Sequence, residues 1–180
     1  MNQKELEDYI LKAANTLRGM AESADVKQFI FPLLFYKRIS DVWGEEFEEA
    51  LELFDSDLDA AKMLENYRFQ IPNGCHWKDI RATSTDIGNK IRKSFREIEN
   101  TNFELLHGVF GNAQWTNKSL LSDAKLIDLI EQLSVVTLSK DNISDDAIGA
   151  GFEFLVKEFA KDTGHTAADF YTNRTVIDLV

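Results

Sequence analysis

Several features of secreted, membrane-bound or disulfide-stabilised proteins are scarce or missing in this sequence. The single cysteine, Cys75, cannot form an internal disulfide bond, which is typical of a reducing compartment. The chain becomes charged at once with Lys4 and Glu5, so we expect no signal peptide. The longest apolar run, residues 29–36, is far shorter than the roughly 20 residues that span a bilayer. We therefore expect a cytoplasmic protein with no membrane partner.

Positive charge is also scarce. The formal net charge of the chain is −11, and such a chain repels the DNA polyanion at a distance. The charges are unevenly distributed, however. Residues 44–66 contain nine acidic residues and only one basic residue, Lys62, whereas residues 78–96 contain six basic and two acidic residues. We expect these two stretches to face different partners.

Helical periodicity dominates the first part of the chain, which has few prolines or glycines to interrupt it. A first helix is predicted to end near Gly19, and a second to begin at Asp25. Pro32 lies inside the second pattern and predicts a kink or a break. The acidic stretch after Trp43 predicts a further helix.

The rest of the chain also has helical spacing, apart from one short segment. Alternation over residues 67–71, followed by Pro72-Asn73-Gly74, predicts a short strand and a turn. Helices are then predicted over residues 87–98, capped by Ser84 or Thr85, over residues 103–110, after Ser122, and from Ser144 to Gly164. The fold class is therefore mainly α: a compact multi-helix bundle with at most a short strand or hairpin near residues 67–75.

The residue patterns predict no metal site and no catalytic residue. Cys75 and His76 are adjacent, but the other histidines, His107 and His165, are distant and isolated, whereas zinc sites need three or four ligands at paired spacings. His76 is poorly placed by sequence to activate Cys75 as a nucleophile. The Gly-x-Gly of residues 149–151 follows a polar loop rather than a strand, so we interpret these glycines as sites of close helix packing.

Three segments together resemble the modification subunit of type I restriction–modification systems. Residues 14–19 (ANTLRG) are similar to the family's ADxLRG helix, and residues 31–41 (FPLLFYKRISD) to its LxFLKxISD helix. Residues 146–155 (DAIGAGFEFL), with Phe159-Ala160, resemble DxxGxxYEYLLxxFA and lead to Phe170-Tyr171-Thr172, like the family's Phe-Tyr-Thr-Pro. The order and spacing match over essentially the whole chain.

The resemblance implies an enzyme that transfers a methyl group from S-adenosylmethionine to adenine N6 in DNA. Such a subunit works with a specificity subunit, which reads the target, and with a restriction subunit. The family's Asn-Pro-Pro-Tyr or Asn-Pro-Pro-Phe pocket for the flipped adenine is missing from this sequence. We therefore expect a helical N-terminal domain at residues 1–165, the start of a connection to the catalytic domain at 166–180, and no activity from this chain alone.

The resemblance also suggests which residues bind ligands. Tyr171 and Thr172 match the motif that helps to form the S-adenosylmethionine site, although this chain alone is not expected to bind the cofactor tightly. Asn173 stands where the family has proline, and residues 167–169 (AAD) replace its usual Gly-Gly followed by Glu or Gln. Our candidates for facing double-stranded DNA are the clustered basic residues: Lys37, Arg38, Lys90, Arg92, Lys93 and Arg96.

Two alternatives remain open from the sequence. The first is a stand-alone helical adaptor that binds protein partners through its acidic stretch and apolar grooves. The second, which we disfavour, is a small complete methyltransferase.

Overall fold

The computed structural model describes residues 1–17, 23–63 and 66–163, and within these ranges its regular structure consists of helices alone. The helices are α1 (Gln3–Thr16), α2 (Ser23–Leu53), α3 (Leu58–Ala61), α4 (Trp77–Arg81), α5 (Ile87–Thr101), α6 (Phe103–Leu106), α7 (Asp123–Leu133) and α8 (Asp145–Thr163). The predicted mainly α fold is confirmed. None of these helices in the described part is long and apolar enough to cross a membrane.

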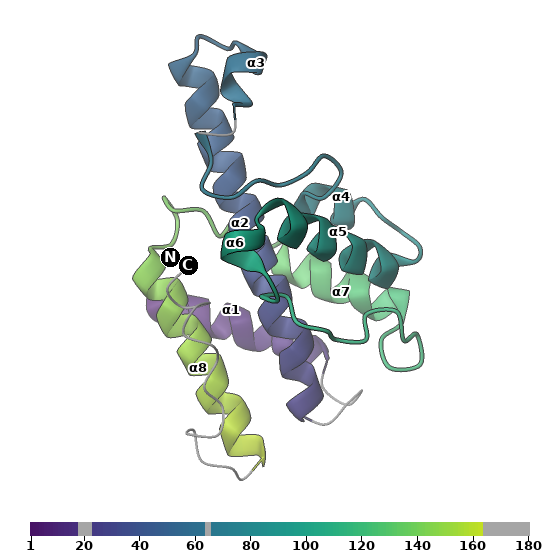
Figure 1. Cartoon of the computed structure of the whole chain (residues 1–180). Helices are drawn as coiled ribbons and strands as arrows, with labels where there is room; N and C mark the ends of the chain where they lie inside the picture. The colour runs from purple at the N-terminus through teal and green to yellow at the C-terminus, as the bar shows by residue number, and fades with distance from the viewer. Residues whose placement is uncertain (18–22, 64–65, 164–180) are drawn as a thin grey trace.

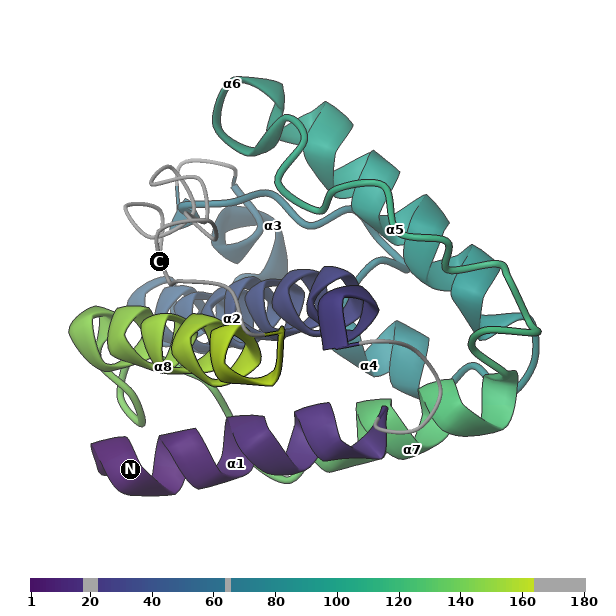
Figure 2. The ribbon, with the colours of Figure 1, turned by 90° about the horizontal axis from the view of Figure 1, so that it is seen from below.

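Helix α2 is the central element of the fold (Figure 1). Figure 2 shows α1, α8, α4 and α5 placed around it. Its side chains are apolar on every face over residues 29–36, and Phe29, Ile30, Leu33 and Tyr36 are at most 2% exposed. A helix that is hydrophobic all round needs partners on all sides, and the surrounding helices supply them. Beyond this core, the C-terminal part of α2 projects away from the body and carries α3 at its end (Figure 1).

Helix α2 continues without a break through Pro32, so of the predicted kink or break the break is wrong, and the kink stays a prediction. The acidic stretch after Trp43 is not a separate helix either, because it continues α2 as far as Leu53. A proline inside a helix removes one backbone hydrogen bond and crowds the preceding turn, at a cost of about 3 kcal/mol. Burial of the neighbouring side chains Leu33, Leu34 and Phe35 offsets that cost.

The segment at residues 67–75 contains the predicted turn but not the predicted strand. The turn is closed by the Cys75 N–H, which donates to the Pro72 carbonyl at 2.9 Å. No second strand pairs with this extended segment in the described part of the chain. Instead, the buried Asn102 side chain accepts from the Gln70 N–H and donates to the Gln70 carbonyl, both at 2.8 Å. One amide side chain thus satisfies the backbone groups that a neighbouring strand would otherwise pair.

The helix starts were predicted with mixed success. Ser122 caps α7 and the Ser144 side chain accepts from the Ala147 N–H at the start of α8, as expected. Ser84 and Thr85 do not cap α5, because its N-cap is Asp86. The helix expected over residues 103–110 is the short α6, which ends at Leu106. Gly19 and Gly164, the expected ends of the first and last helices, lie outside the described residues.

Helix α1 packs against α7 and α8, which are far from it in the sequence. The Tyr9 hydroxyl donates to the Leu133 carbonyl at 2.7 Å. A Cβ atom added to Gly151 would lie 2.9 Å from Ile10 Cδ1 and 3.1 Å from Leu6 Cδ2. Gly151, the second glycine of the Gly-x-Gly, therefore serves close helix packing, as interpreted from the sequence.

Candidate functional site

Four of the predicted DNA-facing residues lie on α5. The helix buries Ile87, Ile91, Phe95 and Ile98 against the core, and this leaves Arg92, Lys93 and Arg96 exposed while Lys90 is half-buried. Side chains three and four positions apart share one helix face, so Arg92, Lys93 and Arg96 point outward together. We call the set Lys90, Arg92, Lys93 and Arg96 the basic face.

The charges of the basic face have no carboxylate partner among the described residues. Lys90 Nζ donates to the Gly74 carbonyl at 2.6 Å, and Arg92 donates to Asn89 Oδ1 at 2.9 Å. Lys93 and Arg96 make no ion pair or side-chain hydrogen bond within the described part of the chain. In contrast, Arg81 from the same basic stretch binds Glu131 through two hydrogen bonds of 2.8 and 2.7 Å. Those bonds raise the pKa of Arg81 and lower the pKa of Glu131.

Helix α5 is firmly anchored at its N-terminus. Asp86 adopts a left-handed backbone conformation (φ 54°), and the Asp123 carboxylate accepts from the Asp86 and Ile87 N–H groups, each at 3.1 Å. The bond from the Asp86 backbone, helped by Lys118, lowers the pKa of Asp123. In the same first turn of α5, a Cβ atom at Gly88 would lie 1.8 Å from the Trp115 carbonyl oxygen. Only glycine fits there, so the basic face is held in a fixed position relative to the core.

A groove runs along one edge of the basic face. It has a volume of about 270 Å³ and lies between α5 and residues 110–115, with Arg92 and Arg96 among the residues that line it. Glu99 also lines the groove, but its carboxylate accepts from the Phe110 N–H at 3.1 Å. The two guanidinium groups are therefore the unpaired charges at this edge, and such groups bind phosphate oxygens well.

Lys37 and Arg38 do not lie on the surface, so the expectation that they face DNA is corrected. Lys37 is 4% exposed and pairs with Asp41, one helical turn further along α2. Its ammonium group also lies 5.7 Å from the centre of the Trp77 ring. Burial lowers the pKa of Lys37, and the neighbouring Asp41 opposes that shift. In this conformation the Lys37 side chain cannot reach a phosphate group.

Arg38 is also an internal structural residue, at 2% exposed. Its guanidinium donates to the carbonyls of Leu138 at 2.7 Å and Ile143 at 3.1 Å, and to Asp145 Oδ1 at 2.6 Å. These partners belong to the connection between α7 and α8 and to the start of α8. Arg38 therefore fixes this connection against α2. The sequence signal for such a role was the position of Arg38 directly after the apolar run of residues 29–36, on the same helix.

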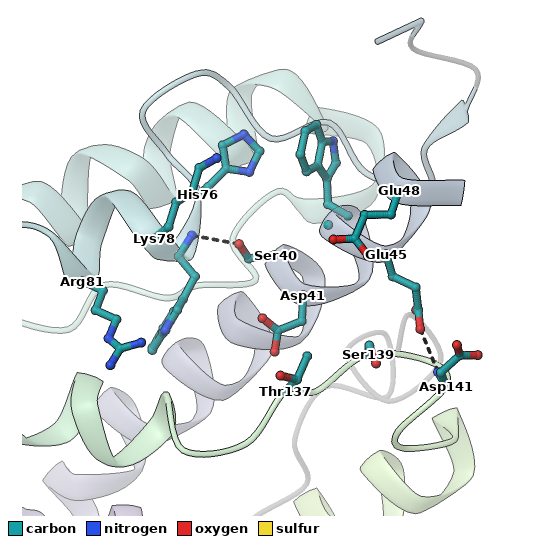
Figure 3. Close-up of a pocket in the computed structure, with 13 residues that line it drawn as sticks. Ser40, Asp41, Glu45, Glu48, His76, Lys78, Arg81, Thr137, Ser139 and Asp141 are labelled. Carbon is teal, nitrogen blue, oxygen red and sulfur yellow. Dashed lines mark hydrogen bonds between the residues drawn. The ribbon is translucent and has the colours of Figure 1, made fainter. Parts of the chain in front are cut away.

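A second cavity, which the sequence patterns did not predict, lies beside Asp41 (Figure 3). It has a volume of about 490 Å³ and is lined by α2, α4 and the connection before α8. Two of the carboxylates that line it make backbone contacts: Asp41 accepts from the Leu138 N–H at 2.6 Å, and Glu45 accepts from the Lys140 and Asp141 N–H groups at 2.7 and 2.9 Å. These contacts hold the connection in place against α2.

The histidine of this cavity, His76, is buried beside an aromatic ring. His76 is 8% exposed, and its ring centre lies 4.3 Å from that of Trp43. Burial lowers the pKa of His76 below its usual value of 6.5. Among the described residues, no group of three or more His, Cys, Asp and Glu side chains is arranged to hold a metal ion. We therefore regard this cavity as a packing seam between elements.

The cofactor candidates Tyr171 and Thr172 lie outside the described residues, and their predicted role remains a prediction. Within the described part, Gly151 of α8 is closed off by Leu6 and Ile10, so a nucleotide cofactor cannot approach the backbone at that glycine. The structure thus brings four of the predicted site residues together on α5 and places Lys37 and Arg38 in the interior.

Comparisons with known proteins agree with this architecture. The chain is 23% identical to the type I restriction enzyme MpnII methylase subunit of Mycoplasma pneumoniae, over 97% of this chain and 38% of that protein. It is 25% identical to the type I restriction enzyme MjaIX methylase subunit of Methanocaldococcus jannaschii, over 98% of this chain and 34% of that protein. The chain thus spans less than half the length of either relative.

The fold is also found in a solved structure. The type I restriction-modification system methyltransferase subunit from Streptococcus thermophilus superposes with a TM-score of 0.70 at 19% identity, over 91% of this chain and 40% of that one. At that identity the likeness concerns the fold alone. The family model described as the HsdM N-terminal domain matches residues 6–133, which is well over half of the chain. The chain therefore belongs to the HsdM N-terminal domain family.

Proposed function

We propose that this domain is the front part of a type I DNA adenine-N6 methyltransferase subunit, in which it docks on the specificity subunit and engages DNA beside the catalytic domain. Membership of the HsdM N-terminal domain family supports the first part of this proposal. The single observation that supports DNA engagement is the basic face on α5, whose charges have no carboxylate partner among the described residues of an acidic chain. In the assembled complex, the restriction subunit completes the system.

The methyl transfer itself belongs to the part of the subunit that follows this domain. S-adenosylmethionine would supply the methyl group there, with Tyr171 and Thr172 at the edge of its site. In the cavity beside Asp41, the Asp41 and Glu45 carboxylates already accept from backbone N–H groups, and we assign the pocket for an adenine that has left the base stack to the catalytic part. The contribution of this domain is binding and positioning.

The basic face suits DNA because phosphate contacts rely on charge rather than on base sequence. Each phosphate that a cation neutralises releases condensed counterions, so the logarithm of the binding constant falls with the logarithm of salt concentration by about 0.9 per contact. Arg92, Lys93 and Arg96 share one exposed face on an anchored helix, which lets them follow a row of phosphates. The target sequence is read by the specificity subunit, so these contacts need no base specificity.

The proposal is tested with the full-length subunit assembled with its specificity subunit. We expect the double reversal Arg92→Glu and Lys93→Glu to weaken binding of target and non-target DNA alike, and to reduce the salt slope by about two. The matched control is Lys4→Glu with Lys12→Glu, which makes the same charge change on exposed positions of α1. An unchanged salt slope in the Arg92/Lys93 variant would refute DNA contact through the basic face.

A stand-alone helical adaptor is the second candidate function. It is favoured by exposed aliphatic side chains at the end of α2 and on α3, which a monomeric protein normally covers. The methyltransferase subunit is expected to be a longer protein that methylates DNA, whereas the adaptor is expected to be a short protein without catalysis. An intact-mass measurement, together with S-adenosylmethionine-dependent methylation of DNA by the native protein, separates them.

A further inference from the structure

The projecting end of α2 and α3, residues 48–63, exposes unusually large apolar side chains. We call this region the tip. Leu53 is 75% exposed, Leu58 is 54% exposed and Met63 is 50% exposed, and all three lie within eleven residues of sequence at the far end of the molecule (Figure 1). Isolated surface leucines are ordinary, but a cluster of this kind rimmed by polar residues marks an interaction surface.

The tip is also strongly acidic. Lys62 is the one basic residue among its described residues. Six exposed residues carry carboxylates: Glu48, Glu49, Glu52, Asp55, Asp57 and Asp59. No ion pair joins any of these six carboxylates to a described basic residue. Glu52 is next to Leu53, and Asp59 is next to Leu58, so the negative charge directly flanks the apolar side chains.

The tip is built as a rigid element. At its base, the Trp43 ring stacks on Phe47 at 5.2 Å and on Tyr67 at 5.0 Å. The Asn66 amide donates to the carbonyls of Ala60 and Ala61 at 3.0 and 3.1 Å, which ties the chain after α3 back to that helix. These contacts hold α3 in place without covering the exposed leucines, so the apolar side chains of the tip stay accessible to a partner.

The turn between α2 and α3 has an uncommon backbone. Asp55 and Ser56 both have positive φ angles, 49° and 67°, which residues other than glycine rarely adopt. The Ser56 N–H donates to the Leu51 carbonyl at 2.7 Å, and Asp57 then caps α3 through bonds to the Asp59 and Ala60 N–H groups. Such outliers concentrate at functional surfaces, where the surrounding structure holds them.

The charge of the tip narrows the choice of partner. DNA and anionic lipid headgroups would be repelled by the carboxylates. A second copy of the tip would bring two acidic rims together, so symmetric self-association through this surface is disfavoured for the same reason. A protein surface with an apolar socket ringed by Lys and Arg complements both the leucines and the acids.

We propose that the tip docks into an apolar, basic-rimmed socket on the specificity subunit. This inference rests on the proposed function, because it takes the specificity subunit as the partner. Within this domain it assigns the two roles to different surfaces: the basic face of α5 engages DNA, and the tip engages protein. Leu53 and Leu58 enter the socket, and Glu52 and Asp59 meet its basic rim.

The experiment measures the dissociation constant between the purified full-length methyltransferase subunit and the purified specificity subunit. We expect Leu53→Ser with Leu58→Ser to weaken binding at least ten-fold. The matched control, Leu105→Ser with Val135→Ser, removes two aliphatic side chains of comparable exposure (49% and 72%) elsewhere and leaves binding unchanged. All four side chains are exposed, so we expect both variants to fold normally. Thermal midpoints of unfolding equal to that of the wild type will show that folding is unaffected.

A second variant tests the charge. Glu52→Lys with Asp59→Lys is expected to weaken binding at low salt and to reduce its salt dependence, whereas Glu104→Lys with Asp128→Lys, at exposed positions outside the tip, leaves both unchanged. If both tip variants bind the specificity subunit with wild-type affinity, the docking proposal is overturned. It is also overturned if the tip variants keep the specificity subunit but no longer bind the restriction subunit. A wild-type subunit that does not bind the specificity subunit overturns the proposed function as well.

Discussion

Two groups of basic residues in this domain have the same chemistry but lie in opposite environments, one in the core and the other on the surface. Lys37 and Arg38 on α2 are in the core, and their charges are satisfied by Asp41, by backbone carbonyls and by Asp145. Lys93 and Arg96 on α5 are exposed and have no partner among the described residues. A cation surrounded by apolar neighbours in the sequence organises the interior, and a cation on the polar side of an amphipathic helix is left for a ligand.

The largest expected effect comes from removing the buried guanidinium. Arg38→Met leaves the Leu138 and Ile143 carbonyls without their donor and Asp145 without its partner. We expect the free energy of unfolding to fall by about 3–5 kcal/mol, as measured by urea denaturation. The matched control is Arg92→Met on the basic face, where we expect a change within about 0.5 kcal/mol. Equal effects at the two positions would contradict the division into internal and external cations.

A smaller loss of stability is expected at Lys37. Lys37→Met leaves Asp41 with the Leu138 N–H but without its cation, and we expect a loss of roughly 2 kcal/mol. Adding Asp41→Asn keeps an acceptor for the Leu138 N–H and removes the unpaired charge. The double variant should therefore regain part of the stability lost by the single variant, and a double-mutant cycle measures the coupling. If the two losses simply add, Lys37 and Asp41 do not act as a pair.

The smallest expected effect is a pH dependence at His76. Burial lowers the pKa of His76 in the folded state below its usual 6.5, so between these two values the unfolded chain binds more protons. The free energy of unfolding should therefore decrease as the pH falls from about 7 to 5. His76→Gln should flatten that decrease, and His107→Gln, which changes an exposed histidine, is the matched control. An identical pH profile in wild type and His76→Gln would show that His76 does not contribute.

The sequence predicted most helices because the relevant signals are local. Ser122 and Ser144 precede apolar periodic segments, and each begins a helix. The failures depend on residues that are distant in the sequence. Ser84 and Thr85 are ordinary capping residues, but the Asp123 carboxylate, which comes from the start of α7, binds the first N–H groups of α5 instead.

The same limit applies to the predicted strand and to the candidate site. Residues 67–71 alternate like a strand, yet the Asn102 side chain pairs with Gln70, and no local pattern reveals that contact. For the site, periodicity correctly placed Arg92, Lys93 and Arg96 on the outer side of α5. It could not show that Lys37 and Arg38 are covered. The carbonyl that accepts from Arg38 and the N–H that binds Asp41, the partner of Lys37, both come from the connection before α8, about 100 residues later.

The packing of α1 against α7 and α8 has a consequence for synthesis in the cell. The apolar face of α1, with Leu6, Tyr9 and Ile10, has its partners at Leu133 and around Gly151. At translation rates of about 5–20 residues per second, the ribosome takes roughly 7–30 seconds to reach the end of α8 after it has made α1. During that interval the first helix is an uncovered amphipathic segment, and hence a binding site for chaperones until the last helix emerges.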